Sequence, residues 1–273
     1  MKTFLIPVDF SDVSYTAAQY AVDMAAHLRA NTVIFYHSYA HRPSDGYDDY
    51  EQATLRHLEK MASKLHIPAT LASEQFIYLA DAKSVTEGVG AIVANYAVSL
   101  IVMGIAGLSD IENTLIGRNA MDVAKSGVAP LLIVPRDHVF KPIKKVVYAT
   151  DLKDVMYVTP AASIIKLAGQ LGAETHVVHV DPATHGQTPE KILGKQEVLR
   201  MLEPLNPEFE VVSEVKDSAD GIFDYVKKHE IDLILMASRN HGFFQRIFHS
   251  SVSKKLLNLA DVPVVLLKNK PVA

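Results

Sequence analysis

The feature that most constrains the fold of this chain is an internal repeat. Asp9 closes one short apolar run and lies 28 residues before His37, which lies near the end of the next run. The same spacing of 28 residues separates Asp151 from His179 in the second half of the chain. A chance match at several spacings is improbable, so the sequence predicts two copies of one structural unit.

A second pair of landmarks supports the repeat. The fourth apolar run ends at Gly104 in the first half and at Ala237 in the second, and a proline that begins the fifth run follows 26 residues later in both halves. Only the middle differs, because 67 residues separate the second and fourth landmarks of the first copy, against 58 in the second. We expect one domain over residues 1–138 and another over 143–273.

Each copy alternates short apolar runs with stretches of helical periodicity. The strands expected in the first copy are residues 4–9, 32–36, 74–79, 99–103 and 130–135. Their counterparts in the second copy include residues 146–151, 177–180, 232–236 and 263–267. Such alternation is typical of α/β folds with helices on both faces of a parallel sheet. The sequence therefore predicts two tandem, open, five-stranded parallel sheets.

Three glycines follow the fourth strand of the first copy. They are Gly104, Gly107 and Gly117. Glycines beyond the carboxyl end of a strand let backbone amides approach a ligand closely. We expect a helix to begin near Asn119, and its free N–H groups and positive dipole would point into the same space. The pattern predicts a phosphate-binding loop.

Composition excludes several classes of function. The chain carries 27 Lys and Arg against 31 Asp and Glu, so it offers no basic stripe for a nucleic-acid backbone. It has no cysteine, which excludes disulfides, thiolate metal sites and cysteine nucleophiles. No apolar run approaches the roughly 18 residues of a membrane span, and no signal peptide precedes the first strand. We expect a cytoplasmic protein with no nucleic-acid or membrane partner.

The motifs together resemble those of a known family. The chain has Pro-Val-Asp-Phe-Ser at residues 7–11, a histidine at the end of the second strand, and Gly-x2-Gly-x9-Gly after the fourth. This combination, in its order, spacing and duplication, resembles the universal stress protein family in its tandem-domain form. The resemblance implies strand order 3-2-1-4-5 in each copy and ATP as the ligand, with or without Mg²⁺. The order reverses between strands 1 and 4, which is where open α/β sheets bind ligands.

The resemblance also implies which residues of the first copy would bind the nucleotide. Asp9 would lie by the ribose or adenine, and the backbone beside Ser38 would meet the adenine edge. The glycines would open the phosphate loop. The full set implied for this site is Pro7, Asp9, Ser38, Met103, Gly104, Gly107, Gly117, Arg118 and Asn119.

Arg118 departs from the family pattern, because family binders usually have Ser or Thr after the last glycine. Arginine can grip phosphate through its fork of donors, yet its bulk can equally fill the pocket. The second copy departs further, with Ala237, Asn240 and Ser250 at the three glycine positions. We expect that copy to bind nucleotide poorly or not at all. Its weaker site would comprise Asp151, Val180, Met236, Ser251 and Val252.

Simpler roles compete with these assignments. The glycines can serve turns and close helix–sheet contacts, and Asp9 can be a cap or turn acceptor. The histidines on apolar strand ends, His37 and His179, are more often core residues than catalysts. The two histidines of the Arg239, His241, Arg246 and His249 group do not have metal-ligand spacing. The sequence therefore assigns no catalytic and no metal site.

The leading interpretation is a non-enzymatic stress-response protein that binds or senses ATP mainly through its first copy. The alternative is an interaction scaffold that binds no nucleotide because both sites are degenerate. Slow ATP hydrolysis ranks below both, since no obvious general base accompanies Asp9.

The resemblance further implies an intramolecular pseudo-dimer in which the fifth strands, residues 130–134 and 263–267, pair. Such pairing would cover two sheet edges that otherwise invite aggregation. The chain could then be a monomer in solution, and further association into a homo-oligomer is left open.

Overall fold

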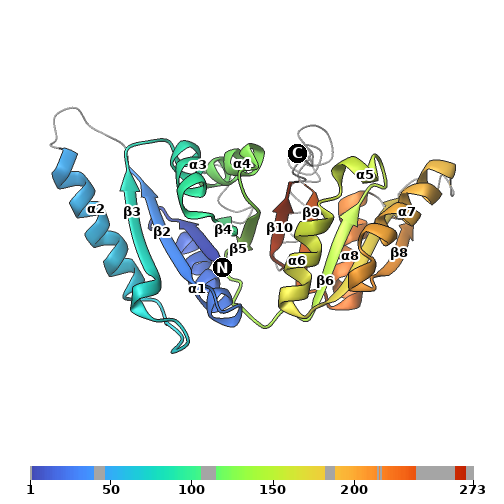
Figure 1. Cartoon of the computed structure of the whole chain (residues 1–273), viewed down its shortest axis with the longest axis horizontal. Helices are drawn as coiled ribbons and strands as arrows, with labels where there is room; N and C mark the ends of the chain where they lie inside the picture. Colours follow the sequence, from blue (N-terminus) through green and yellow to red (C-terminus); the bar gives the residue numbers. More distant parts are fainter. Residues whose placement is uncertain are drawn as a thin grey trace. The chain divides into compact units, whose positions relative to one another are not determined.

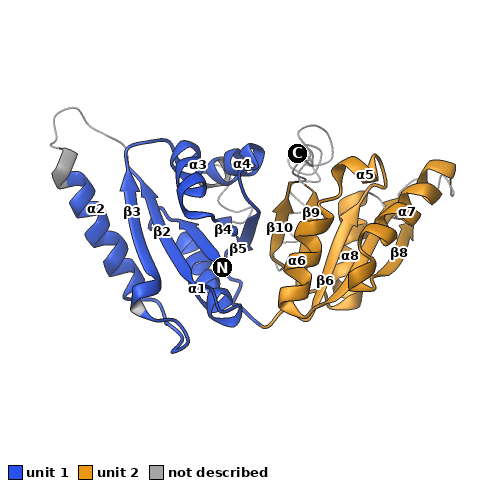
Figure 2. Cartoon of the chain, in the orientation of Figure 1, with its two compact units in different colours: residues 1–141 blue, residues 142–273 orange. Residues whose placement is uncertain are grey.

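The structure is a computed structural model, and it divides the chain into two compact units (Figure 2). Unit 1 is residues 1–141 and unit 2 is residues 142–273. The residues that the structure describes are 2–39, 47–105, 115–181, 188–213, 215, 217–237 and 262–268.

Unit 1 alternates strands and helices from its start (Figure 1). Its elements are β1 (Thr3–Pro7), α1 (Asp12–His27), β2 (Thr32–Ser38), α2 (Tyr47–Ala62), η1 (Ser73–Gln75), β3 (Phe76–Asp81), α3 (Val85–Tyr96), β4 (Leu100–Ile105), α4 (Leu115–Ser126) and β5 (Leu131–Pro135).

Unit 2 repeats this order over its described residues. Its elements are β6 (Lys145–Thr150), α5 (Val155–Val158), α6 (Ala161–Leu171), β7 (Glu174–Asp181), α7 (Pro189–Met201), η3 (Glu203–Leu205), β8 (Glu208–Ser213), α8 (Ser218–His229), β9 (Leu233–Ala237) and β10 (Val264–Leu267).

The strands of each unit pair in parallel and in the predicted order. In unit 1 the order is β3-β2-β1-β4-β5, and in unit 2 it is β8-β7-β6-β9-β10. The register is also repeated, because β1 pairs Leu5 with Ile34 and β6 pairs Val147 with His176. The predicted α/β fold with parallel sheets is confirmed.

Helices cover both faces of each sheet (Figure 1). Right-handed crossovers place α1 and α2 on one face of unit 1 and α3 and α4 on the other, and α3 and α4 contact each other. All residues of β1 and β5 are buried, as are all but the last of β4. Strands buried on both faces must be apolar throughout, which explains the continuous apolar runs of the sequence.

The expected start of one helix was wrong. Helix α4 begins at Leu115 and not near Asn119, so Gly117 and Arg118 lie in its first turn. The first N–H groups of a helix have no intrahelical acceptor, and one glycine there is tolerated at a cost of about 1 kcal/mol. The end of α4 matches the expectation that Gly127 stops this helix. The helix ends at Ser126, and Gly127 follows with a positive φ of 57°.

Strand β3 also differs from the expectation. It begins at Phe76, because Glu74 belongs to the short helix η1.

Within the described parts of the chain, no helix combines the length and the apolar character that crossing a membrane requires.

Candidate functional site

A hollow lies at the carboxyl ends of β1 and β4, the two strands between which the order of unit 1 reverses. Its empty volume is about 380 Å³, which includes space open to solvent. Strands β1 and β4 and helices α1, α3 and α4 contribute to its wall. The residues that line it are Pro7, Val8, Asp9, Ser14, Val85, Met103, Gly104 and Asn119.

Five residues of the predicted site therefore come together in one hollow. They are Pro7, Asp9, Met103, Gly104 and Asn119. Most of the wall is apolar, and Asp9 is the charged group among the described lining residues. A carboxylate in this position can accept hydrogen bonds from sugar hydroxyls, while the apolar wall suits a flat base.

A tight turn after β1 holds Asp9 at the hollow. Its Oδ1 accepts hydrogen bonds from the backbone N–H of Ser11 at 3.1 Å and from the Ser11 hydroxyl at 2.6 Å. Phe10, between them, has a φ of 64°. A bulky residue in the left-handed region is uncommon and marks a conformation imposed by its surroundings. In the described part of the chain, Oδ2 of Asp9 accepts no hydrogen bond from the protein. The Asp9 side chain is exposed.

Unit 2 builds the same turn. Leu152 has a φ of 57°, and the backbone N–H of Lys153 donates to Oδ1 of Asp151 at 3.1 Å. The turn is therefore a property of the repeated fold. Asp9 therefore has the turn-acceptor role that the sequence offered as the alternative to ligand binding. This role uses one of its two carboxylate oxygens.

The two repeated histidines hold the strand ends together. Nδ1 of His37 lies 2.6 Å from the carbonyl oxygen of Val8, and Nδ1 of His179 lies 3.0 Å from that of Thr150. Val8 and Thr150 each precede the aspartate of their turn. A ring nitrogen that donates to this carbonyl positions the turn, so these histidines are positioning residues and not hollow-lining ones.

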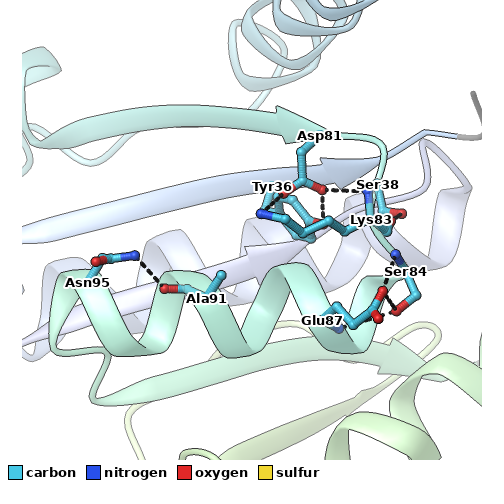
Figure 3. A network of polar contacts seen from close by, with 8 residues as sticks. All are labelled: Tyr36, Ser38, Asp81, Lys83, Ser84, Glu87, Ala91 and Asn95. Carbon is cyan, nitrogen blue, oxygen red and sulfur yellow. Dashed lines mark hydrogen bonds and ion pairs between the residues drawn. The ribbon is translucent and has the colours of Figure 1, made fainter.

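Ser38 lies outside the hollow's wall. It ends β2, and its hydroxyl donates to the carbonyl oxygen of Lys83 (Figure 3). In the same network the hydroxyl of Tyr36 donates to Oδ1 of Asp81 at 2.8 Å, and Asp81 forms an ion pair with Lys83 at 3.3 Å. Burial and the hydrogen bond to Asp81 raise the pKa of Tyr36 well above its usual value. The network secures the loop that leads into α3.

Helix α3 begins with a capping box at the end of this loop (Figure 3). The Ser84 hydroxyl accepts from the backbone N–H of Glu87, and the Glu87 carboxylate accepts from the Ser84 N–H and hydroxyl. These bonds lower the pKa of Glu87. A carboxyl group whose pKa is lower in the folded than in the unfolded chain stabilises the fold at pH values above its unfolded pKa. This stabilisation is lost as the pH falls through the folded pKa.

We expect Ser84→Ala to raise the pKa of Glu87 toward its ordinary value and to cost about 1 kcal/mol through loss of the N-cap. The pKa is measured by NMR titration of the Glu87 carboxyl, and stability by denaturant unfolding. Ser63→Ala, which removes an exposed hydroxyl bonded to the carbonyl of Lys60, is the control. An unchanged Glu87 titration in Ser84→Ala would contradict this account.

The glycines of the motif have different places. A Cβ on Gly104 would come within 2.6 Å of the carbonyl oxygen of Val13 in α1, so this glycine permits close packing of helix and sheet. Gly107 lies outside the described residues. Gly117 and Arg118 are in the first turn of α4, where the side chain of Arg118 is not described.

The second copy has a hollow in a different place. About 250 Å³ of empty space lies beside β6, β7 and α8, lined by Ala149, Thr150, Asp151, Val178, Val180, Ser218 and Ile222. It includes Asp151 and Val180 of the predicted weaker site. Met236, on β9, is not in its wall, and Ser251 and Val252 lie outside the described residues.

The site predicted from the sequence did not include Val8, Ser14 and Val85 of the first hollow. Val8 directly follows β1, whereas Ser14 lies in the first turn of α1 and Val85 in the first turn of α3. The N-caps before them, Ser11 and Ser84, are the signal that could have placed these turns at the carboxyl edge of the sheet.

The sequence model of the universal stress protein family matches residues 1–135 and 142–268. The chain belongs to this family. It contains two universal stress protein domains in tandem, as the sequence motifs predicted. No curated protein sequence matches the chain.

Two solved structures with TM-scores above 0.5 share this fold along almost the whole chain, and a third is similar to part of it. A universal stress protein from Archaeoglobus fulgidus DSM 4304 is similar with a TM-score of 0.65 at 17% identity, over 98% of this chain and 97% of that one. A protein of unknown function from Pseudomonas aeruginosa PAO1 has a TM-score of 0.57 at 11% identity, over 98% and 93%. A universal stress protein from Archaeoglobus fulgidus in complex with dAMP covers 48% of this chain and all of its own, with 22% identity and a TM-score of 0.32.

Proposed function

We propose that unit 1 of this universal stress protein binds an adenine nucleotide in the hollow between β1 and β4. The observation that carries the proposal is the convergence of Asp9, Met103, Gly104 and Asn119, from three elements, on one hollow at the reversal point of the sheet. The hollow contains about 380 Å³ of empty space, part of which is open to solvent.

The chemistry of the wall suits a nucleoside. Asp9 would accept hydrogen bonds from the ribose hydroxyls, and Val8, Val85 and Met103 would contact the base. The phosphates would extend toward the first turn of α4, where free N–H groups and the helix dipole favour anions. ATP, with Mg²⁺ as counter-ion, is the ligand we favour.

The proposed role is binding or sensing without catalysis. Asp9 is the ionisable group among the described lining residues, and phosphoryl transfer needs several positioned charges. We further propose that unit 2 binds nucleotide poorly, because Ala237, Asn240 and Ser250 stand where unit 1 has glycines. A ligand bound by unit 1 would stabilise whichever conformation holds it.

The second candidate is a scaffold that binds no nucleotide. One observation favours it: the first glycine of the motif, Gly104, is required for packing against α1 whether or not a ligand binds. The glycine pattern alone therefore does not distinguish the two candidates, and a binding measurement is needed.

We expect Asp9→Ala to weaken nucleotide binding at least tenfold, since hydrogen bonds to a charged group are worth about 1.5–3 kcal/mol. ATP, ADP, AMP and dAMP are titrated by calorimetry, each with and without Mg²⁺. Asp151→Ala is the matched control, because it removes the same turn acceptor from unit 2. The nucleotide affinity of Asp151→Ala should stay within twofold of that of the unsubstituted chain.

The absence of both binding heat and a shift in melting temperature at millimolar nucleotide would favour the scaffold. Equal weakening of nucleotide binding by Asp9→Ala and Asp151→Ala would contradict a site in unit 1, because it would place the effect in the general stability of the turns.

A further inference from the structure

A cluster of histidine and glutamate side chains lies in unit 2, away from both hollows. Glu174 and His176 come from the start of β7, Glu208 from the start of β8, and Tyr225 and His229 from the second half of α8. The hollow of unit 2 adjoins the carboxyl end of β6, whereas this cluster adjoins the amino ends of β7 and β8. It is therefore independent of the proposed nucleotide site.

The distances within the cluster are those of potential metal ligands. Nε2 of His176 lies 3.1 Å from Oε1 of Glu174, and Nδ1 lies 3.8 Å from Oε2 of Glu208. One ligand atom from each of the three residues lies within 4.8 Å of the others. Ligand atoms around tetrahedral Zn²⁺ are about 3.4 Å apart. The glutamate side chains are 49% and 69% exposed, so they have the freedom to close this difference.

A buried nitrogen without a hydrogen bond is the second observation. The side chain of His176 is 2% exposed, and among the described residues its Nε2 has no hydrogen-bond partner despite the nearby carboxylate. Nε2 of His229 is likewise buried and without a hydrogen bond in the described part of the chain, although Oε2 of Glu210 lies 3.2 Å away. Buried polar atoms usually have a partner, so these nitrogens need an explanation such as an ion.

The remaining nitrogen of His176 has a fitting partner. Nδ1 lies 2.9 Å from the hydroxyl of Tyr225, which can accept a hydrogen bond from Nδ1–H, and in that tautomer the lone pair is on Nε2. A hydrogen bond of this kind to the second ring nitrogen is typical of metal-binding histidines.

The fold itself does not require the cluster. The register places Ile34 and Ile77 of unit 1 where unit 2 has His176 and Glu208. These two strand positions are thus apolar in unit 1 and carry potential metal ligands in unit 2, whereas the counterpart of Glu174 is Thr32. Among the described residues, the grouping of two glutamates with a histidine is found in unit 2 and is not required by the shared fold.

We propose that Glu174, His176 and Glu208 bind a Zn²⁺ ion at the amino edge of the unit 2 sheet. Imidazole and carboxylate ligands suit this ion, and three protein ligands leave its fourth position to water or to His229. The rings of His229 and His176 are 5.6 Å apart, so His229 is near enough to approach the ion. The competing state is His176 protonated and ion-paired with the glutamates.

Zinc binding is tested on the full chain without an affinity tag and without nucleotide, after treatment with EDTA. Calorimetry should give one Zn²⁺ site, and Glu174→Gln and Glu208→Gln should each weaken it at least tenfold. Glu203→Gln, an exposed glutamate of η3, is the control and should leave the affinity within twofold. Binding of Zn²⁺ by other histidines is common to all variants and cancels in the comparison.

The ligand role of His176 has a readout that does not depend on substitution of a buried residue. Titration with Zn²⁺ should shift the ¹⁵N resonance of His176 Nε2, and Co²⁺ should give the visible absorption of a tetrahedral site. Equal zinc affinity of the chain, Glu174→Gln and Glu208→Gln would overturn the proposal. So would a His176 ring that carries protons on both nitrogens before and after addition of zinc.

Discussion

Replacing Gly88 by alanine is expected to lower the free energy of unfolding of unit 1 by about 3 kcal/mol. A Cβ at this position in α3 would overlap the hydroxyl of Tyr36 and come within 2.5 Å of its Cζ. Tyr36 is 1% exposed, and its hydroxyl is bonded to Asp81, so its ring has no free space to enter. The substitution must separate α3 from β2 or break that hydrogen bond.

Gly90, two residues further along the same helix, provides the matched control. A Cβ there meets nothing within 4 Å. Gly90→Ala should therefore raise stability by about 0.5–1 kcal/mol, because alanine loses less conformational entropy in a helix. Denaturant unfolding, with hydrogen exchange of the β2 amides to assign the transition to unit 1, measures both changes. Shifts of the same sign in the two variants would show that the packing of Gly88 is not the cause.

The second large effect is expected for Gly104→Ala, which should destabilise unit 1 by about 2–3 kcal/mol. Its Cβ would lie 2.6 Å from the carbonyl oxygen and 2.7 Å from Cγ1 of Val13. The carbonyl oxygen belongs to the backbone of α1, so the whole helix must move. This loss should appear with and without nucleotide, since it arises from packing.

Val13→Ala separates the two parts of that clash. It removes Cγ1 but leaves the carbonyl oxygen, so the double variant should be more stable than the sum of the single effects predicts, without full recovery. A Gly104→Ala variant that keeps the stability of the unsubstituted chain and loses nucleotide binding would reverse our interpretation. Gly104 would then serve the ligand and not the contact with α1.

The sequence predicted the strands well because parallel strands buried on both faces must be apolar throughout, and the repeat supplied a second example of each strand. The strand order was implied by the resemblance to the universal stress protein family, because apolar runs alone do not specify which strands are neighbours. Asp9 and Gly104 were predicted to meet because their strands end at one edge of the sheet. Helix α4 was less well predicted: Leu115 and Ile116 suit a helix, and glycine in a first turn is tolerated, so its start carried no clear signal.

Other features depend on distances that no local pattern encodes. Ser14 and Val85 reach the hollow because α1 and α3 pack closely on the sheet, and glycines at positions 104 and 88 permit that approach. The neighbouring positions of His176 and Glu208 follow from the register of β7 with β8, although 32 residues separate them along the chain.

The sequence by itself determined that two copies of one parallel α/β unit follow each other, because hydrophobic burial dictates periodicity and duplication preserves spacing. Only the tertiary structure decided which side chains share a hollow, that Gly104 packs against α1, and that a buried histidine lies beside two glutamates in unit 2. Those outcomes depend on how closely helices approach the sheet and how strands align, and both are set by contacts between residues far apart in the chain.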